Sequence, residues 1–558
     1  MRVFIIVFLY CSLYAYDYDK ALWNKVIYFS DNQPEIESAN FYLSTKNDFT
    51  AEDELSTTVD LLRSSKYGKM TACAYPLRYT FIKSQNISIP TYDLSSCNDL
   101  EDFTVNFKKN NLYLAFSSEY ISVPSSAFGH IMIVLKKKDV SFEIANTIHF
   151  AATTNNNDGF FKYNWKGLTG GYQGYYVLDV FFKKLYEYNT KEQRNIYLYK
   201  LDFSDEQIKK IIYALYELRK ATFKYYFFNK NCAIYTTQLL NISSDKLLNE
   251  KFFYLPLDTL QEYKNNIVER KVFLSLINKI DYLYNALSKE DKTKFEEIIR
   301  KNTIVDNSLH NDLKLLLINY YQFQFRKFHT SYKNYNSVMD LNYEDILIEN
   351  NSLNPIDKKA SYIGITYIQN EENDKSLLLS YRPLYSDIHD FKYNNLQNTE
   401  FSVFKTVLKL EDKSLSIEQF DIMSMKSYAK RSVYYKPLSW QLYSGFNKEN
   451  NDENLKFTNE IGLGVTQQVF NNINISLLGN VGLSNITPFI GGEVYISKNF
   501  RRDIKFEINS YYNLFFQKDD FYKNTLTLLY KKMNFIYSIN YENSSLENSI
   551  NFGIKYYF

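Results

Sequence analysis

The chain has 558 residues, which is too long for one ordinary core and suggests two to four domains. Its formal net charge of +2 excludes the basic footprint of a nucleic-acid-binding protein, so no nucleic-acid partner is expected. Tyrosine and phenylalanine, at 52 and 43 residues, are over-used. Such aromatics fit pleated strands and membrane-interface belts, and a compositional bias of the source genome is the alternative explanation.

Residues 1–15 have the pattern of an export signal. A basic Arg2 is followed by an apolar run from Val3 to Leu13 and by the small Ala15 before YDYD. The run is too short to span a membrane and predicts a cleaved signal peptide. Cys11 follows a bulky tyrosine, where a lipoprotein signal has a small residue, so we expect it to leave with the signal. No later stretch reaches 18 apolar residues, so no transmembrane helix is predicted.

Removal of the signal leaves Cys73, Cys97 and Cys232. In an exported protein an even pair of cysteines is usually structural, and Cys73 with Cys97 is the natural disulfide. Such a bond would close a 25-residue loop and stabilise it by roughly 3 kcal/mol in the chain-entropy model. Cys232 is then the odd thiol, and reactivity is the usual reason for one to persist in an oxidising compartment. The sequence alone leaves other pairings open.

Residues 16–70 are predicted to be helical and polar, and from Asn111 the pattern becomes that of strands. The strand IMIVL and the second strand SFEIANTIHFAA predict a hairpin. His130 stands between a glycine turn and the first strand, and His149 lies on the second. A single histidine on an apolar strand is more often a satisfied core residue than a catalyst. Two on one hairpin raise the odds of a functional role.

A glycine-rich stretch follows, WKGLTGGYQGYY, which contains Gly170, Gly171 and Gly174. It lacks the strand–turn–helix context of a phosphate loop. We therefore expect either close backbone packing or a lid beside the site. Further on, Ser204 is predicted to cap a helix with an apolar stripe made of Ile208, Ile211, Ile212, Leu215 and Leu218.

In the stretch KYYFFNKNCAIYTTQLLN an aromatic run gives way to a helical pattern at Cys232. The cysteine would lie in the first turn, where aligned peptide dipoles favour the thiolate, the nucleophilic form. The plainer interpretation is a buried structural cysteine, and for a lone cysteine it is the commoner one. His130, in an equally distinctive setting, shifts the balance toward a cysteine–histidine pair.

Residues 245 to 335 continue in helical periods. His310 and His329 lie there with no carboxylate or cysteine at metal-ligand spacing, so both are predicted to be structural or exposed. The sequence indicates no metal and no cofactor.

Near Asn350 the apolar period changes from 3.6 to 2. In the last strand Ile550, Phe552 and Ile554 alternate with polar residues, and we count about a dozen such runs of roughly ten residues each. The pattern predicts a transmembrane β-barrel, and a soluble sandwich is the alternative. The export signal, the aromatic strand ends and the terminal Phe558 favour the barrel.

Several motifs in order carry a family resemblance. They are CAYPLRY, VPSSAFGHIMIVL, IHFAA, YNWKGLTGGYQG, YEYNTKEQRNIYLYKLDFSDEQ and YYFFNKNC. With these the chain resembles the Lnb-type N-terminal periplasmic domain, a family named after bacterial lipoprotein N-acyltransferases. The resemblance covers about residues 73 to 245, and we expect it to extend to about Tyr335.

That family is similar to circularly permuted papain-like enzymes, in which the histidine strand precedes the cysteine helix. Here His130 comes 102 residues before Cys232. The resemblance implies that Cys232 is the nucleophile and His130 the base. His149 stands where the residue that orients the imidazole ring is expected, and asparagine is expected there in relatives. Lys230 departs from the acidic residue that relatives commonly carry.

The resemblance also implies acyl transfer through a thioester, with Asn231, Gly129 and Tyr226 as supporting residues near the oxyanion. The expected partner is a membrane lipid or a lipoprotein at the outer membrane. The alternatives are a cysteine amidase or peptidase acting on cell-wall peptide, and a non-enzymatic outer-membrane protein with a binding domain.

The sequence therefore predicts an α+β fold. A permuted papain-like domain with an added helical layer precedes an antiparallel β-barrel of about 12 strands. The N-terminal part is expected in the periplasm and the barrel in the outer membrane. The predicted segments are a signal peptide at 1–15, a helical region with the disulfide loop at 16–110, a catalytic core at 111–245, a helical layer at 246–345 and the barrel at 346–558.

Overall fold

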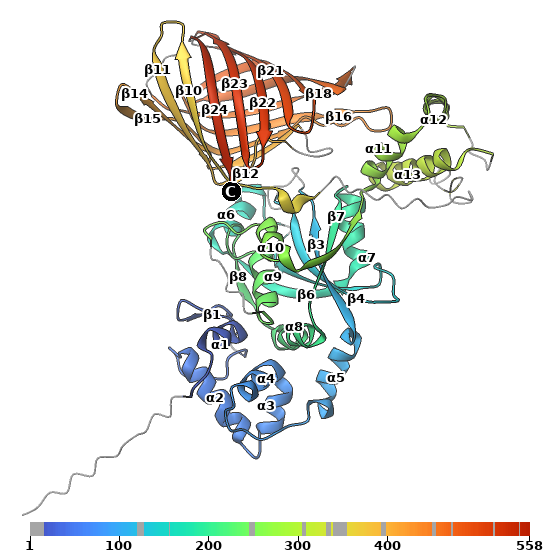
Figure 1. The fold of residues 1–558 in the computed structure, drawn as a ribbon, viewed down its shortest axis with the longest axis vertical. Helices are drawn as coiled ribbons and strands as arrows, with labels where there is room; N and C mark the ends of the chain where they lie inside the picture. The colour runs from blue at the N-terminus through green and yellow to red at the C-terminus, as the bar shows by residue number, and fades with distance from the viewer. Residues whose placement is uncertain are drawn as a thin grey trace, which may run out of the picture. The chain divides into compact units, whose positions relative to one another are not determined.

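The fold was analysed in a computed structural model, which is shown in Figure 1. The structure describes residues 16–558 apart from 39, 120–127, 156, 245–250, 304–307, 331–335, 337, 339–353, 392–397, 449–453, 470–471, 517–518 and 546. The predicted signal peptide, most of the turn before Gly129 and the start of the predicted barrel region lie outside these residues.

The chain divides into two compact units. The first comprises Met1–Ser117, His130–Glu187 and Ile196–Phe273, and the second comprises Ser118–Gly129, Tyr188–Asn195 and Leu274–Phe558. Each unit is described below by itself.

The first unit begins with a group of helices, and one disulfide joins two parts of it. The helices are α1 (Lys20–Ile27), α2 (Ala51–Arg63), α3 (Gly68–Ala74), α4 (Pro76–Ser84) and α5 (Asn98–Thr104). Cys73, in α3, is bonded to Cys97, which directly precedes α5, and their Cα atoms are 5.5 Å apart. The predicted disulfide is confirmed.

A buried ion cluster holds these helices to the following domain. The guanidinium of Arg78, in α4, lies 2.6 Å from a carboxylate oxygen of Glu54 and 3.2 Å from one of Glu217. One cation faces two carboxylates away from water, and burial raises the pKa of Glu217 to about 7. The arginine of the CAYPLRY motif is therefore a structural residue.

The centre of the first unit is a seven-stranded sheet in the order β8-β6-β5-β4-β3-β7-β9. Its strands are β3 (Asn110–Ser117), β4 (His130–Lys137), β5 (Asn146–Ala152), β6 (Tyr172–Val180), β7 (Ile196–Leu201), β8 (Phe223–Tyr225) and β9 (Ile267–Phe273). The predicted hairpin is present, since β4 and β5 pair antiparallel with Ile133 opposite Ile148. The residues between Ile131 and Leu135 of β4 are all buried.

Helices lie beside this sheet (Figure 1). They are α6 (Phe160–Thr169), α7 (Phe181–Lys184), α8 (Asp205–Leu218), α9 (Cys232–Asn241) and α10 (Pro256–Glu262). Ser204 caps α8 through a capping box with Gln207, and the predicted apolar stripe of this helix is buried. Both features of α8 are confirmed.

Three strands of the sheet were not predicted. The stretch WKGLTGGYQGYY was expected to form a glycine-rich turn, but it contains the end of α6 and the start of β6. The short strand β8 lies in the aromatic run before Cys232. Residues 245–335 read as helical, but β9 pairs antiparallel with β7 at the edge of the sheet. Most of its residues are half-exposed, so no alternation marks it in the sequence.

The second unit contains a small helical cluster made of α11 (Leu276–Ala286), α12 (Lys289–Lys301) and α13 (Asn311–Phe328). Leu276, Phe295 and Leu316 are among the residues of its apolar core. His310 caps the start of α13 and His329 its end, and both are exposed. These two histidines are structural or exposed, as predicted.

The rest of the second unit is a closed antiparallel barrel of 12 strands (Figure 1). The ring runs through β10 (Tyr362–Asn370), β11 (Lys375–Arg382), β14 (Thr406–Glu411), β15 (Ser414–Ser427), β17 (Ser439–Asn447), β18 (Lys456–Val469), β19 (Ile473–Ser484), β20 (Thr487–Asn499), β21 (Ile504–Phe515), β22 (Phe521–Lys532), β23 (Phe535–Ser544) and β24 (Asn548–Tyr557). It closes because β10 pairs with β24. The predicted barrel and its strand number are confirmed.

The barrel wall continues past two of its strands. The short strands β12 (Leu384–Ser386) and β13 (Thr399–Val403) pair with each other and extend the β11–β14 ladder. The chain between them therefore starts at one mouth of the barrel.

The barrel has apolar side chains outside and polar side chains inside. Leu463 and Leu477 are 60% and 52% exposed, whereas Thr466 and Ser476 on the same two strands are fully buried. This is the reverse of a soluble protein and is the arrangement of a membrane-spanning barrel, whose lipid face is apolar. None of the helices that the structure describes combines the length and apolar character that a membrane crossing requires.

Candidate functional site

Helix α9 begins at Cys232, in the predicted first-turn position, and the residue before it caps the helix. The side-chain oxygen of Asn231 accepts hydrogen bonds from the backbone N–H groups of Ala233 at 2.8 Å and Ile234 at 3.3 Å. A cap of this kind satisfies amide groups that the helix leaves unpaired. It fixes the helix start, and with it the backbone of the cysteine.

The nitrogen of the same Asn231 side chain donates to the carbonyl oxygens of Phe227 at 2.9 Å and Tyr254 at 2.8 Å. An amide side chain has two donors and two acceptor sites, and here all four are used by the backbone. Asn231 was predicted as a supporting residue near the oxyanion. Its side chain serves to hold three backbone segments together around the start of α9.

Buried hydrogen bonds also fix the body of α9. The hydroxyls of Thr237 and Thr259 both donate to the carbonyl oxygen of Ala233, at 3.0 and 3.2 Å. The hydroxyl of Tyr176, from β6, donates to the carbonyl oxygen of Tyr235 at 2.7 Å. These bonds connect the first turns of α9 to the neighbouring helix α10 and to the sheet.

Both predicted histidines lie on the strands that α9 packs against, β4 and β5. His130 is the first residue of β4, opposite Ser117 of β3, and His149 lies within β5. The two imidazole rings are 6.1 Å apart between centroids and meet edge to face at 73°. Cys232 is buried at 8% exposure. The three predicted catalytic residues therefore lie on elements that are in contact.

His149 is held in its neutral form. Its pKa is lowered to about 3, mainly by burial and also by repulsion from Lys184, while Asp179 opposes the shift. Within the described residues, the Nδ1 atom of this ring has no hydrogen-bond partner. The neutral His149 imidazole packs against the ring of His130 and brings no charge to the site.

The glycine-rich stretch packs tightly against the aromatic segment before Cys232. Gly170 ends α6 with φ +77°, and a Cβ there would lie 2.3 Å from the ring of Tyr226. Gly174 lies within β6, where a Cβ would come 2.3 Å from the ring of Phe150. Gly171 lies between them, with Lys166 against it. These are the contacts of close backbone packing, one of the two predicted roles of the glycines.

The segment before the cysteine forms a small hairpin. Tyr226, a predicted supporting residue, donates its backbone N–H to the carbonyl oxygen of Lys230 at 2.9 Å. The N–H of Phe227 donates to the carbonyl oxygen of Gly167 at 2.9 Å. The ammonium of Lys230 is partly exposed and 3.9 Å from a carboxylate oxygen of Glu35. Gly129, the third supporting residue, precedes β4 with φ +85°.

Asp158, which the sequence analysis did not single out, anchors the start of α6. Its side chain is 1% exposed and accepts from Lys162 at 3.0 Å, Lys166 at 2.8 Å and the hydroxyl of Tyr172 at 2.9 Å. The three partners come from later positions in the chain. Only the lysine four residues away has a spacing that marks an ion pair in sequence.

Across the part of the chain that the structure describes, no three histidine, cysteine, aspartate or glutamate side chains gather as metal ligands.

In comparisons with known proteins, three segments of the chain match family models. Residues 99–266 match the family model described as the Lnb N-terminal periplasmic domain. Residues 357–533 and 18–85 match two domains of unknown function, DUF7840 and DUF7843. No curated protein matches the chain.

Among solved structures, the KdgM porin is 14% identical and covers 35% of this chain and 99% of its own, with a TM-score of 0.24. The NanC porin is 10% identical, covering 36% and 100% of the two chains, with a TM-score of 0.25. An outer membrane channel from Pseudomonas putida F1 is 8% identical, covering 38% and 100%, with a TM-score of 0.24. The 12-stranded barrel is established by its own strand pairing.

The family model and the apolar outer face of the barrel indicate the same cellular location, the outer membrane and its periplasmic side. The matched domain family is periplasmic, and a barrel with an apolar outer face is of the outer-membrane type. Residues 99–266 thus match the model of the Lnb N-terminal periplasmic domain family, and an outer-membrane-type barrel of 12 strands follows them in the same chain.

Proposed function

We propose that the periplasmic domain is a cysteine-dependent acyltransferase that acts through a thioester on a lipid or lipoprotein substrate. The observation that carries the proposal is the placement of Cys232, at the capped start of a helix that packs on the strands of His130 and His149. A helix N-terminus favours the thiolate, and a histidine within reach can take the thiol proton.

In the first step the Cys232 sulfur attacks the carbonyl carbon of an acyl ester. A carbon–sulfur bond forms, the ester carbon–oxygen bond breaks, and the leaving oxygen takes the proton held by the His130 imidazole. Backbone N–H groups near the cysteine stabilise the negative charge on the carbonyl oxygen. His149, neutral and in edge contact with His130, orients that ring.

In the second step an amine attacks the thioester. The carbon–sulfur bond breaks, the amine gives one proton to His130, and an N-acyl product leaves. Water in place of the amine gives hydrolysis. The barrel supports a lipid substrate, because a membrane anchor in the same chain keeps the domain where acyl chains are presented.

The proposal is tested by trapping the acyl-enzyme. The full chain in detergent is mixed with a diacyl phospholipid and quenched with acid, and the peptide containing Cys232 is weighed by mass spectrometry. The expected result is a mass increase of one acyl chain. Cys232→Ala removes it, and His130→Gln slows its formation by about 10²-fold or more.

A matched control is His310→Gln, at an exposed helix cap, which leaves the adduct unchanged. An adduct formed only with cell-wall peptide would replace the lipid substrate by a peptide amide. No adduct with either substrate would favour a binding domain in which Cys232 is an inert thiol.

A further inference from the structure

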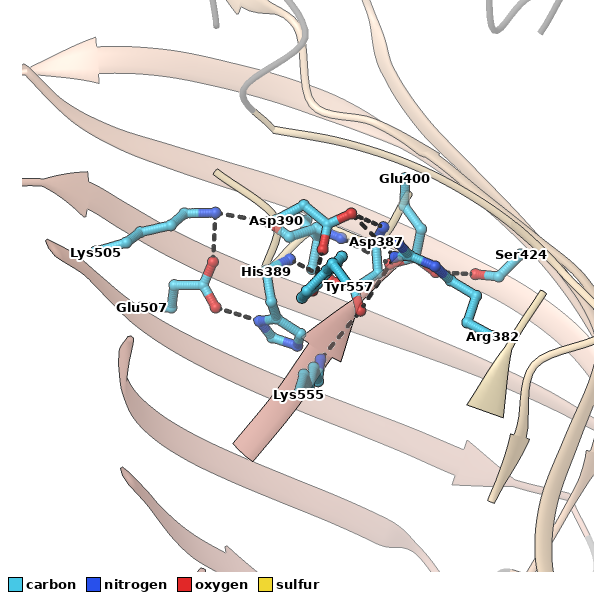
Figure 2. A network of polar contacts seen from close by, with 11 residues as sticks. Arg382, Asp387, His389, Asp390, Glu400, Ser424, Lys505, Glu507, Lys555 and Tyr557 are labelled. Carbon is cyan, nitrogen blue, oxygen red and sulfur yellow. Dashed lines mark hydrogen bonds and ion pairs between the residues drawn. The ribbon is translucent and has the colours of Figure 1, made fainter. Parts of the chain in front are cut away.

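Residues 387–391 follow β12 and enter the barrel from one mouth; they are called the lumen segment here. Figure 2 shows their contacts with the inner wall. Asp387 lies 3.1 Å from the ammonium of Lys555, in β24. The carbonyl oxygen of Ile388 accepts from Lys505, in β21, at 2.6 Å. The segment is therefore bonded to two strands that β22 and β23 separate in the ring.

Asp390 connects the lumen segment to a third part of the wall. It accepts from Arg382, in β11, at 3.0 Å and from the hydroxyl of Tyr557, in β24, at 2.6 Å. Arg382 is fully buried, and Asp387 lies 3.6 Å from the same guanidinium. A buried guanidinium needs such partners, because an unpaired charge away from water is costly.

His389 adds a further polar contact between the lumen segment and the wall. Its Nδ1 atom contacts the carboxylate of Glu507, which also lies 2.5 Å from the ammonium of Lys505 (Figure 2). The backbone N–H of His389 donates to Asp387 at 2.7 Å, which holds the segment in a tight turn. Acidic side chains therefore face basic ones where the lumen segment contacts the barrel wall.

The lumen segment also contributes to an apolar cluster inside the barrel. Ile388 packs with Leu478 of β19, Tyr495 of β20 and Tyr428, which directly follows β15. All four side chains are at most 6% exposed. The hydroxyl of Tyr428 lies within hydrogen-bonding distance of two acceptor oxygens, that of Gln441 at 2.8 Å and one of Glu493 at 2.9 Å. Contacts with β11, β19, β20, β21 and β24 place the lumen segment across the interior.

We propose that the lumen segment closes the barrel, so that the native barrel anchors the chain in the membrane without offering an open passage. A passage for ions or solutes requires water-filled space across the membrane. Here the interior at this mouth holds a buried apolar cluster and matched charges. The proposal does not depend on the chemistry of Cys232.

The test is conductance of the full chain in a planar lipid bilayer. In the opening variant the lumen segment becomes Gly-Ser-Gly-Ser-Gly, which keeps the loop length and removes the acidic, imidazole and apolar side chains that the segment contributes. The native chain is expected to give no stepwise ion current, and the opening variant regular steps. A matched replacement of the exposed turn 371–374 between β10 and β11 is expected to stay silent.

A milder variant, Asp387→Asn with Asp390→Asn, keeps the volume and removes both carboxylates that face Arg382. It is expected to give brief openings. Heat-dependent migration on a denaturing gel confirms a folded barrel for each variant before recording. Regular current from the native chain would overturn the proposal, and so would silence of a folded opening variant.

Discussion

The seven-stranded sheet and the barrel use the pleat of a strand in opposite ways. In β4 of the sheet a run of apolar side chains is buried on both faces, and α9 and α10 pack on it. In β18 and β19 of the barrel, apolar side chains such as Leu463 and Leu477 point outward, and polar ones such as Thr466 and Ser476 are enclosed. A period of two identifies a strand, but what surrounds the sheet decides which of its faces becomes the interior.

The two regions also bury charge differently. In the first unit a single cation, Arg78, serves two carboxylates. In the barrel the lumen segment and the wall match several cations with several carboxylates (Figure 2). The predictions below test this comparison.

The largest effect is expected at the buried ion cluster. Arg78→Met leaves Glu54 and Glu217 buried without their cation, which should lower the free energy of unfolding of the first unit by about 3–5 kcal/mol. Denaturant titration followed by hydrogen exchange of the helical region measures the loss. Lys69→Met, at an exposed position, is the matched control and should change little. Equal effects of the two would show that the cluster is not essential.

The next effect distinguishes the outer face of the barrel from an ordinary protein surface. Leu463 is 60% exposed near the middle of β18, and Leu463→Arg should destabilise the barrel by about 2–4 kcal/mol in a bilayer. The same change on a water-exposed surface is nearly neutral. Urea unfolding in lipid vesicles gives the difference, with Met533→Arg in an exposed turn as control. A neutral Leu463→Arg would contradict a lipid-facing β18.

The third prediction concerns pH and the interior of the sheet. The pKa of His149 is about 3 in the fold and about 6.5 in the unfolded chain, so the unfolded state binds the extra proton. Stability of the first unit should therefore fall as pH drops below about 6.5, by about 2 kcal/mol at pH 5. His149→Gln should remove this part of the slope. An unchanged slope would show that other groups cause it.

The smallest effect is expected at the cap of α9. Asn231→Ala removes four hydrogen bonds, three of them buried, and should cost about 1–2 kcal/mol. It should also slow alkylation of Cys232, because the helix start is no longer fixed. Ser288→Ala, at the exposed cap of α12, is the control that should leave the alkylation rate unchanged. If both variants alkylate Cys232 at the native rate, the cap does not position the thiol.

Local patterns were enough for much of the fold. The stripe of α8 and the hairpin of His130 and His149 follow from spacing within one element or between neighbours. The barrel and its strand number followed from the period of two. The disulfide was predicted because an even pair of cysteines in an exported chain is usually structural, although the sequence left other pairings open.

Contacts between distant segments were not visible in the sequence. Arg78 meets Glu217 across 139 positions, and Lys505 meets Ile388 across 117. Hydrophobic periodicity does not predict such pairs, because it describes only neighbouring positions within one helix or strand. The edge strand β9 was missed for a related reason, since partial exposure of most of its residues leaves no alternation to detect.

The central claim is that Cys232 is an activated thiol paired with His130, and the most direct test is its alkylation rate as a function of pH. Iodoacetamide is added to the folded native chain and to His130→Gln between pH 5 and 9, and modified Cys232 is counted by mass spectrometry. The account predicts rapid native labelling below neutral pH and a slower, rising profile in the variant. Slow labelling of both proteins, rising together toward the pKa of about 8.5 of an ordinary thiol, would contradict it.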